Sequence, residues 1–122
     1  MTLSRLAALL LALNLLAPAQ AMDIETYDKQ VKLPPSSAAQ VRLTSYLLGL
    51  GEGLRLANTA LRARGEPEFF CTPENANLFA ADYRRLIDGA LAGARATLYN
   101  QQQSIEQILL KALQDTYPCP GR

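Results

Sequence analysis

Histidine and tryptophan are absent from this chain of 122 residues, and cysteine occurs only at Cys71 and Cys119. Without histidine, neither a Ser-His nor a Cys-His catalytic pair can form. A metal cluster of histidine and cysteine ligands is excluded for the same reason. Catalysis would therefore have to depend on carboxylates.

Carboxylates lie close together in the sequence in two groups. Both groups fall on segments expected at the surface, with no apolar pocket that would separate the pKa values of an acid and a base. We expect solvated charges there, and a protein that has no catalytic residue, cofactor or metal site and is not an enzyme. The groups are Glu66 with Glu68, and Asp23 with Glu25 and Asp28.

The first 21 residues have the pattern of a cleavable signal peptide. Arg5 precedes an apolar run over residues 6–16, and Ala19-Gln20-Ala21 matches the small-residue cleavage site. The run is shorter than the about 20 residues that a membrane-spanning helix needs. We expect cleavage after Ala21, a periplasmic protein, and no membrane anchor after cleavage.

The mature chain carries evenly mixed charges. Removal of Arg5 leaves equal numbers of acids and bases, and no basic face accumulates, so a nucleic-acid or anionic-membrane partner is not indicated. Residues 22–36 combine helical spacing with many charges and end at Pro34-Pro35. We expect an ordered but loosely attached N-terminal arm there, and a single helical domain over residues 37–122.

A long helix is predicted to begin at Ser37 and to end at Gly65 and Pro67. Ser37 to Gln40 form a capping box, in which the Ser37 hydroxyl accepts from the Gln40 amide and the Gln40 side chain reaches back. Asn58 projects near the apolar stripe and is expected to satisfy backbone groups. The stripe consists of Leu43, Leu47, Leu50, Leu54, Ala57 and Leu61.

Three glycines interrupt this helix at Gly49, Gly51 and Gly53. Together they cost roughly 2–3 kcal/mol of helix propensity relative to alanine. Gly49 and Gly53, with Tyr46 and Ala60 near the same side, would form a face where another helix packs closely or the helix kinks. A phosphate-binding loop is the alternative, but no strand precedes the glycines and the G-x-G-x-x-G spacing is incomplete.

Two further amphipathic helices are predicted, and with them an all-α fold: a small disulfide-tied bundle of three main helices with an N-terminal arm. Thr72-Pro73-Glu74 has the residues of a helix start, and this helix should end near Gly89 to Gly93. Its apolar face consists of Leu78, Phe79, Tyr83, Leu86, Ile87 and Ala90.

The last helix should begin at a second capping box, Ser104 to Gln107, and end at Tyr117-Pro118. Between the second and third helices, residues 92–103 are expected to form a surface loop and a candidate contact surface. The apolar face of the last helix consists of Ile105, Ile108, Leu109, Ala112 and Leu113.

The two cysteines are expected to form a disulfide bond in an exported protein. The bond would join the start of the second helix to the end of the third and hold them as an antiparallel pair, with Phe69 and Phe70 as apolar anchors beside Cys71. On the chain-entropy model it stabilises the fold by about 4 kcal/mol. Two free thiols and an intermolecular bridge remain the alternatives.

The signal peptide and several of the segments described above together resemble the Rap/Tai immunity proteins of bacterial type VI secretion. The resemblance implies a small, periplasmic, all-helical protein in which Cys71 and Cys119 are bonded. It also implies a protein that binds and blocks a peptidoglycan-cleaving effector, often an amidase. No effector-contacting motif can be carried over. The residues of the resemblance are Tyr46, Gly49, Gly51, Gly53, Ala57, Asn58, Leu61, Phe70, Cys71, Pro73, Ala112, Leu113, Tyr117, Pro118 and Cys119.

The leading hypothesis is a periplasmic immunity protein that occludes the active cleft of a secreted cell-wall hydrolase. A periplasmic acid-stress chaperone and a structural envelope subunit are the alternatives, and homodimer formation stays open. The turn over residues 65–68 and the loop over residues 92–103 are the first contact candidates. Their candidate residues are Gly65, Glu66, Glu68, Arg95, Tyr99, Gln101, Gln102 and Gln103.

Overall fold

The computed structural model describes residues 21–93, 99–100 and 102–121. The helices of this part of the chain are α2 (Ile24–Val31), α3 (Ala38–Ala63), α4 (Ala80–Ala92) and α5 (Ile105–Thr116). The all-α prediction is therefore confirmed. The predicted signal peptide lies outside the described residues except for Ala21. No helix within the described ranges combines the length and the apolar character that a membrane crossing requires.

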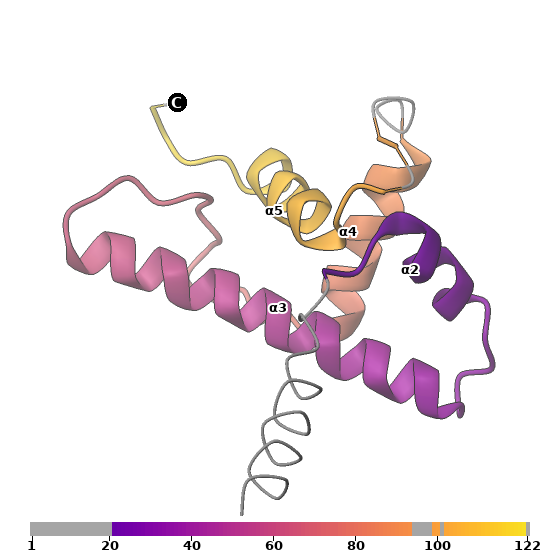
Figure 1. Cartoon of the computed structure of the whole chain (residues 1–122). Helices are drawn as coiled ribbons and strands as arrows, with labels where there is room; N and C mark the ends of the chain where they lie inside the picture. Colours follow the sequence, from indigo (N-terminus) through magenta and orange to yellow (C-terminus); the bar gives the residue numbers. More distant parts are fainter. Residues whose placement is uncertain (1–20, 94–98, 101, 122) are drawn as a thin grey trace, which may run out of the picture.

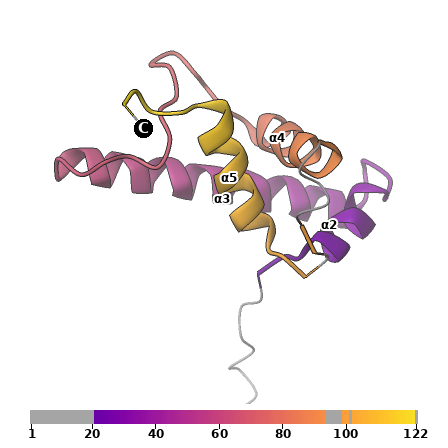
Figure 2. The ribbon, with the colours of Figure 1, turned by 90° about the horizontal axis from the view of Figure 1, so that it is seen from above.

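The long helix α3 runs along one side of the molecule, and the other helices pack against it (Figure 1). Helix α4 packs against both α3 and α5, and α5 crosses α3 in the view from above (Figure 2). The core lies between these helices. Its buried residues are Ile24, Tyr27, Leu43, Leu47, Phe70, Tyr83, Ile87, Ile105, Ile108, Leu109 and Leu113.

The N-terminal segment belongs to this core, so the expectation of a loosely attached arm is wrong. Tyr27 is 1% exposed, and its hydroxyl donates a hydrogen bond of 2.6 Å to Asp88 on α4. The charged residues that suggested a free arm lie on the outer side of α2, where Glu25 pairs with Lys29. A short helix with two buried side chains is enough to anchor the segment, because Ile24 is buried as well.

The predicted start of α3 is confirmed, but only half of its capping box forms. The Ser37 hydroxyl accepts from the Gln40 amide at 3.2 Å. The Gln40 side chain does not reach back to Ser37; it donates to the carbonyl of Gln30 at 2.7 Å. This buried side chain therefore ties the end of α2 to the first turn of α3, a use that only the tertiary structure offers.

Of the three glycines, only Gly51 permits a close approach. A Cβ atom at Gly51 would lie 2.1 Å from the ring of Tyr83 on α4, whereas Cβ atoms at Gly49 and Gly53 would meet nothing within 4 Å. The predicted packing face of Gly49 and Gly53 is therefore wrong, and α3 continues through all three residues. The close contact between α3 and α4 falls on the glycine between them.

Helix α4 begins at Ala80 and not at Thr72-Pro73-Glu74, so the predicted start is wrong. Pro73 makes only a single turn, in which its carbonyl accepts from Ala76 at 2.9 Å. The helix is capped where Asp82 accepts from the backbone N–H of Phe79 at 2.8 Å. Its end near Gly93 is confirmed, but Phe79, predicted on the apolar face, has a 63% exposed side chain.

Helix α5 has the predicted bounds, but only one of the two hydrogen bonds of its predicted capping box forms among the described residues. Ser104 is the N-cap and accepts from the Gln107 amide, and the chain leaves the helix at Tyr117. All five residues predicted on its apolar face are buried. The 3.6-residue period was decisive here because every apolar residue of α5 faces neighbouring helices.

Candidate functional site: an apolar groove between α3 and the segment before α4

The predicted disulfide bond between Cys71 and Cys119 is confirmed. It joins the loop before α4 to the tail after α5, and not the start of α4 to the end of α5 as expected, because α4 begins nine positions after Cys71. The backbone N–H of Cys71 also donates to the Tyr117 carbonyl at 2.8 Å. The bond and this hydrogen bond fix two segments that have no regular secondary structure of their own.

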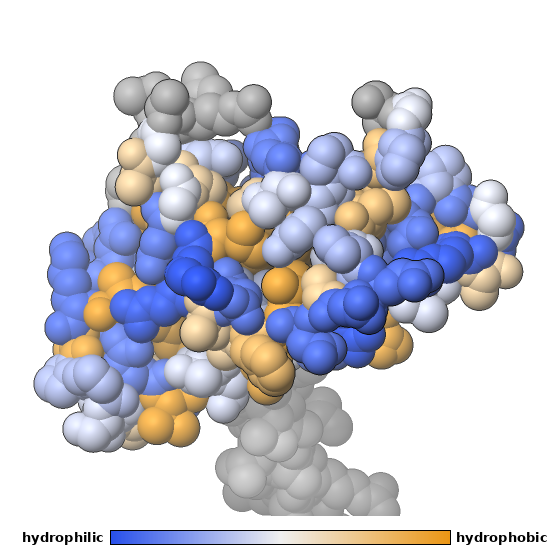
Figure 3. All heavy atoms as spheres, turned by 180° about the vertical axis from the view of Figure 1, so that it is seen from behind, coloured by the Kyte–Doolittle hydropathy of each residue, from blue (hydrophilic) through white to orange (hydrophobic). Residues whose placement is uncertain are grey.

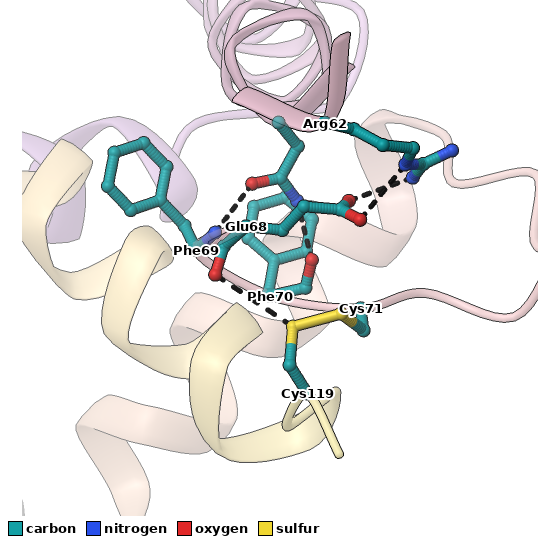
Figure 4. The surroundings of a disulfide bond; sticks show 7 residues. Arg62, Glu68, Phe69, Phe70, Cys71 and Cys119 are labelled. Carbon is teal, nitrogen blue, oxygen red and sulfur yellow. Dashed lines mark hydrogen bonds and ion pairs between the residues drawn. A yellow bond between two sulfur atoms is a disulfide. The ribbon is translucent and has the colours of Figure 1, made fainter. Parts of the chain in front are cut away.

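Asn58 holds the same loop from the side of α3. Its amide donates to the Phe70 carbonyl at 2.6 Å, and its side-chain oxygen accepts from the Phe69 N–H at 2.8 Å. Figure 4 shows Phe69 and Phe70 beside the disulfide bond. The expectation that Asn58 satisfies backbone groups is confirmed. Phe70 is the buried anchor of the loop, whereas Phe69, expected to be a second anchor, is exposed.

The first candidate contact segment, Gly65 to Glu68, lies at the end of α3 near the disulfide bond. Glu68 pairs with Arg62 at 2.8 Å, and Glu66 pairs with Arg64 at 2.7 Å. The Arg62 guanidinium holds the pKa of Glu68 below its usual range. A cleft of about 410 Å³ is lined by Glu66, Glu68, the two cysteines and residues 120–121. Both carboxylates already have a cation, so this cleft offers little free charge to a partner.

The described residues of the second candidate contact segment lie at the opposite end of the molecule (Figures 1 and 2). Arg95 and Gln101 lie outside the described residues. Tyr99 packs against the core, and Gln102 is exposed. The Gln103 side chain accepts from the Asn100 N–H. The described parts of the two candidate segments are therefore not brought together into one surface.

A third surface, which the sequence did not indicate, is a groove of about 430 Å³ between α3 and the segment before α4. We call it the Phe79 groove. One wall is a single face of α3, with Leu48, Glu52 and Arg55, and the other is the segment 76–79. Leu48 is 41% exposed and Phe79 is 63% exposed. Two large apolar side chains at this groove are therefore exposed to solvent over a considerable part of their surface.

Gly51 determines how close the two walls of the Phe79 groove lie to each other. Because Gly51 has no side chain, the Tyr83 ring lies directly on α3 and brings the first turn of α4 against that helix. The N–H of Phe79 is held by Asp82, so the backbone that carries the exposed ring is fixed. The groove is therefore a consequence of how α4 docks on α3.

One ion pair provides the charge of the Phe79 groove. Arg55 and Glu52 lie 2.7 Å apart, and the hydrogen bond from Arg55 lowers the pKa of Glu52. Burial, and then the charge of Glu52, raises the pKa of Tyr83 beneath the groove. The Phe79 groove thus combines apolar surface with one ion pair that can orient a bound group. This combination is typical of a site that binds a side chain of another protein.

On one face of the molecule, the apolar surface is divided into small areas. Figure 3 shows the face behind the view of Figure 1, where orange residues lie between blue ones and do not form one continuous sheet. The exposed large apolar residues beyond the groove are Leu33, Val41, Leu56 and Phe69. Single exposed apolar residues are ordinary, whereas Leu48 and Phe79 share one concave surface.

The carboxylate groups noted in the sequence have structural roles. Asp23 accepts from the Thr26 N–H as the N-cap of α2, and Glu25 pairs with Lys29. Within the described ranges, no group of three metal-ligating side chains is close enough to hold a metal ion. Asp23 and Glu25 therefore stabilise helix α2.

No family model, curated protein or solved structure matches this chain. The resemblance to Rap/Tai proteins thus stays a prediction from the quoted residues. Of these residues, Gly51, Asn58, Phe70 and the cysteines have defined structural roles. Tyr46 contacts Glu106, while Gly49, Gly53, Pro73 and Pro118 are exposed.

Proposed function

We propose that this chain is an exported, periplasmic immunity protein that binds a type VI secreted, peptidoglycan-targeting effector of the amidase type. In this proposal the protein inhibits the effector by occluding its active cleft. It acts by surface complementarity and carries out no chemical step. The Phe79 groove is the contact surface, and the other faces of the helical scaffold hold it in position.

The observation that carries the proposal is the exposed Phe79 ring beside an apolar groove. Complete burial of a phenylalanine side chain contributes about 1.5–3 kcal/mol relative to an exposed one. Aromatic side chains at the centre of an interface often supply much of the binding energy. A ring that stands out from a fixed backbone could therefore enter a cleft of the effector, while a side chain of the effector occupies the groove.

The scaffold around the groove is suited to an inhibitor because its segments are already fixed. Asp82 holds the backbone of Phe79, and the disulfide bond and Asn58 hold the loop that precedes it. Ordering a flexible side chain or loop on binding costs about 0.5–1.5 kcal/mol for each immobilised side chain. A preformed surface avoids much of this cost. Stable interfaces bury about 1,600 Å² in total, so adjacent residues such as Leu56 would take part.

Co-expression in the periplasm with the toxin encoded by the adjacent gene tests the proposal in cells. We expect the toxin alone to lyse the cells and the two proteins together to leave them intact. Continued lysis in the presence of the folded, disulfide-bonded protein would contradict the proposal. The oxidation state is checked by non-reducing mass spectrometry of the exported protein.

A matched pair of variants on α3 tests the surface. Leu48→Asp places a charge in the Phe79 groove, whereas Val41→Asp places the same charge on the same helix outside the groove. Both side chains are exposed, at 41% and 60%, so both variants should fold. We expect Leu48→Asp to lose protection and Val41→Asp to keep it. Equal protection by both variants would show that the partner binds elsewhere.

A further inference from the structure

The backbone of residues 22–24 is hydrogen-bonded to the beginning of α5. The Met22 carbonyl accepts from the Ile105 N–H at 2.7 Å, and the Ile24 N–H donates to the Gln103 carbonyl at 3.2 Å. Asp23 and Ser104 form an antiparallel bridge between these two hydrogen bonds. The position of Met22 is therefore fixed by its own backbone, together with the buried side chain of Ile24.

The Glu106 carboxylate, at the beginning of α5, has one oxygen atom without a hydrogen-bond partner among the described residues. Tyr46 on α3 donates a hydrogen bond to Oε1 of Glu106, which belongs to the first turn of α5. Oε2 of Glu106 is buried and has no hydrogen-bond partner within the described part of the chain. Among the ion pairs of the described residues, none includes Glu106. A buried acceptor without a partner is costly and rare in native proteins.

The Met22 backbone lies beside the same pair of residues, because its carbonyl accepts from Ile105, the residue before Glu106. Burial, and then the hydrogen bond to Glu106, raises the pKa of the Tyr46 hydroxyl, and the Met22 N–H opposes this rise. A partner for Oε2 of Glu106 is still missing among the described residues. In the sequence, the Ala21–Met22 bond is the predicted cleavage site of the signal peptide.

We propose that Glu106, oriented by Tyr46, is the binding site for the α-ammonium group that signal-peptide cleavage creates at Met22. The exporting cell's signal peptidase would add water across the Ala21–Met22 amide bond. The hydroxyl of the water goes to the Ala21 carbonyl carbon, and its hydrogen goes to the Met22 nitrogen. The new amine takes up one proton from solvent and the Ala21 carboxyl group releases one. The ammonium then has three N–H donors where the precursor has one.

This ion pair would distinguish the mature protein from its precursor. The uncleaved chain offers Glu106 only an uncharged amide, so its folded state lacks the pair. The exported chain gains the pair and the disulfide bond after the membrane has been crossed. The completed fold is thereby linked to maturation, and the inference does not depend on which effector the protein binds.

The inference is tested with two proteins released from the same cleavable fusion, one beginning at Met22 and one at Ala19. In the longer protein the ammonium lies three residues away from the site. We expect the protein that begins at Met22 to unfold at a temperature about 4–8 °C higher. Glu106→Gln should abolish this difference, because its side chain keeps the shape without the charge. Glu25→Gln, which removes an exposed charge on α2, should leave the difference intact.

A direct titration of the Met22 amine keeps the test informative even if Glu106→Gln folds poorly. In the protein that begins at Met22, NMR should give the α-amine a pKa above the usual range of about 7.7–8.0. In the proposed site the amine would face Tyr46 and Glu106, which are hydrogen-bonded to each other, whereas the Asp23 carboxylate is bound to Thr26. Equal unfolding temperatures, an ordinary amine pKa, or a mature N-terminus other than Met22 in the exported protein would each overturn the inference.

Discussion

Replacing Gly51 by alanine should destabilise this protein, although the same change at the neighbouring glycines should stabilise it. A Cβ atom at position 51 would lie 2.1 Å from two ring atoms of Tyr83. Tyr83 is buried between α3 and α4, so the ring cannot turn aside without displacing other core residues. The clash therefore has to be relieved by moving α4 away from α3.

The expected change in the free energy of unfolding follows from two opposing effects. Alanine gains about 1 kcal/mol over glycine in the interior of a helix. Forcing an extra methyl group into a packed core costs about 1–3 kcal/mol and occasionally more, and this contact is at the severe end of that range. We expect Gly51→Ala to lower the free energy of unfolding by about 2 kcal/mol. Gly49→Ala and Gly53→Ala meet open space and should raise it by about 0.5–1 kcal/mol.

Urea unfolding, followed by circular dichroism, measures all three variants and a double variant in which Tyr83→Leu removes the ring. The double variant should recover part of the stability that Gly51→Ala loses, which gives a measurable coupling between the two sites. The reasoning is refuted if Gly51→Ala is as stable as the parent protein while Gly53→Ala gains the expected increment.

Three further changes test other parts of the structure. Asn58→Ala removes both hydrogen bonds to the loop and should lower the free energy of unfolding by about 2–3 kcal/mol, measured by urea unfolding; a loss under about 0.5 kcal/mol would contradict this role. Replacing both cysteines by alanine should cost about 4 kcal/mol in the same assay and leave the helical signal intact in water. Burial, and then the hydrogen bond to Asp88, raises the pKa of Tyr27 well above its ordinary value of about 10. The stability that depends on its neutral phenol is complete below about pH 10 and is lost as the pH rises through the folded-state pKa. Tyr27→Phe, followed by pH-dependent unfolding, should therefore weaken the alkaline loss of stability.

The sequence predicted a helix correctly where only one face of that helix contacts the core. The period of α5 and the caps Ser37 and Ser104 were predicted from local rules, because these residues act within one turn of their own helix. The disulfide bond followed from the count of cysteines. The end of α3 at Gly65 also followed, since its backbone has a positive φ that favours glycine.

The errors arose where tertiary contacts override a local signal. Thr72-Pro73-Glu74 has the residues of a helix start, but Asn58 and Tyr117 hold the adjacent backbone in the loop. Gly49 and Gly53 share one face, but that face is in solvent. The Phe79 groove could not be predicted, because Phe79 was assigned to the apolar face of a helix that begins later than expected.

Binding between the mature disulfide-bonded protein and the toxin encoded by the adjacent gene, measured by isothermal titration calorimetry, tests the proposed function most directly. We expect a one-to-one complex that Leu48→Asp weakens at least about 100-fold, equivalent to about 2.7 kcal/mol, and that Val41→Asp leaves unchanged. No binding of the toxin, or equal binding by both variants, would contradict the account.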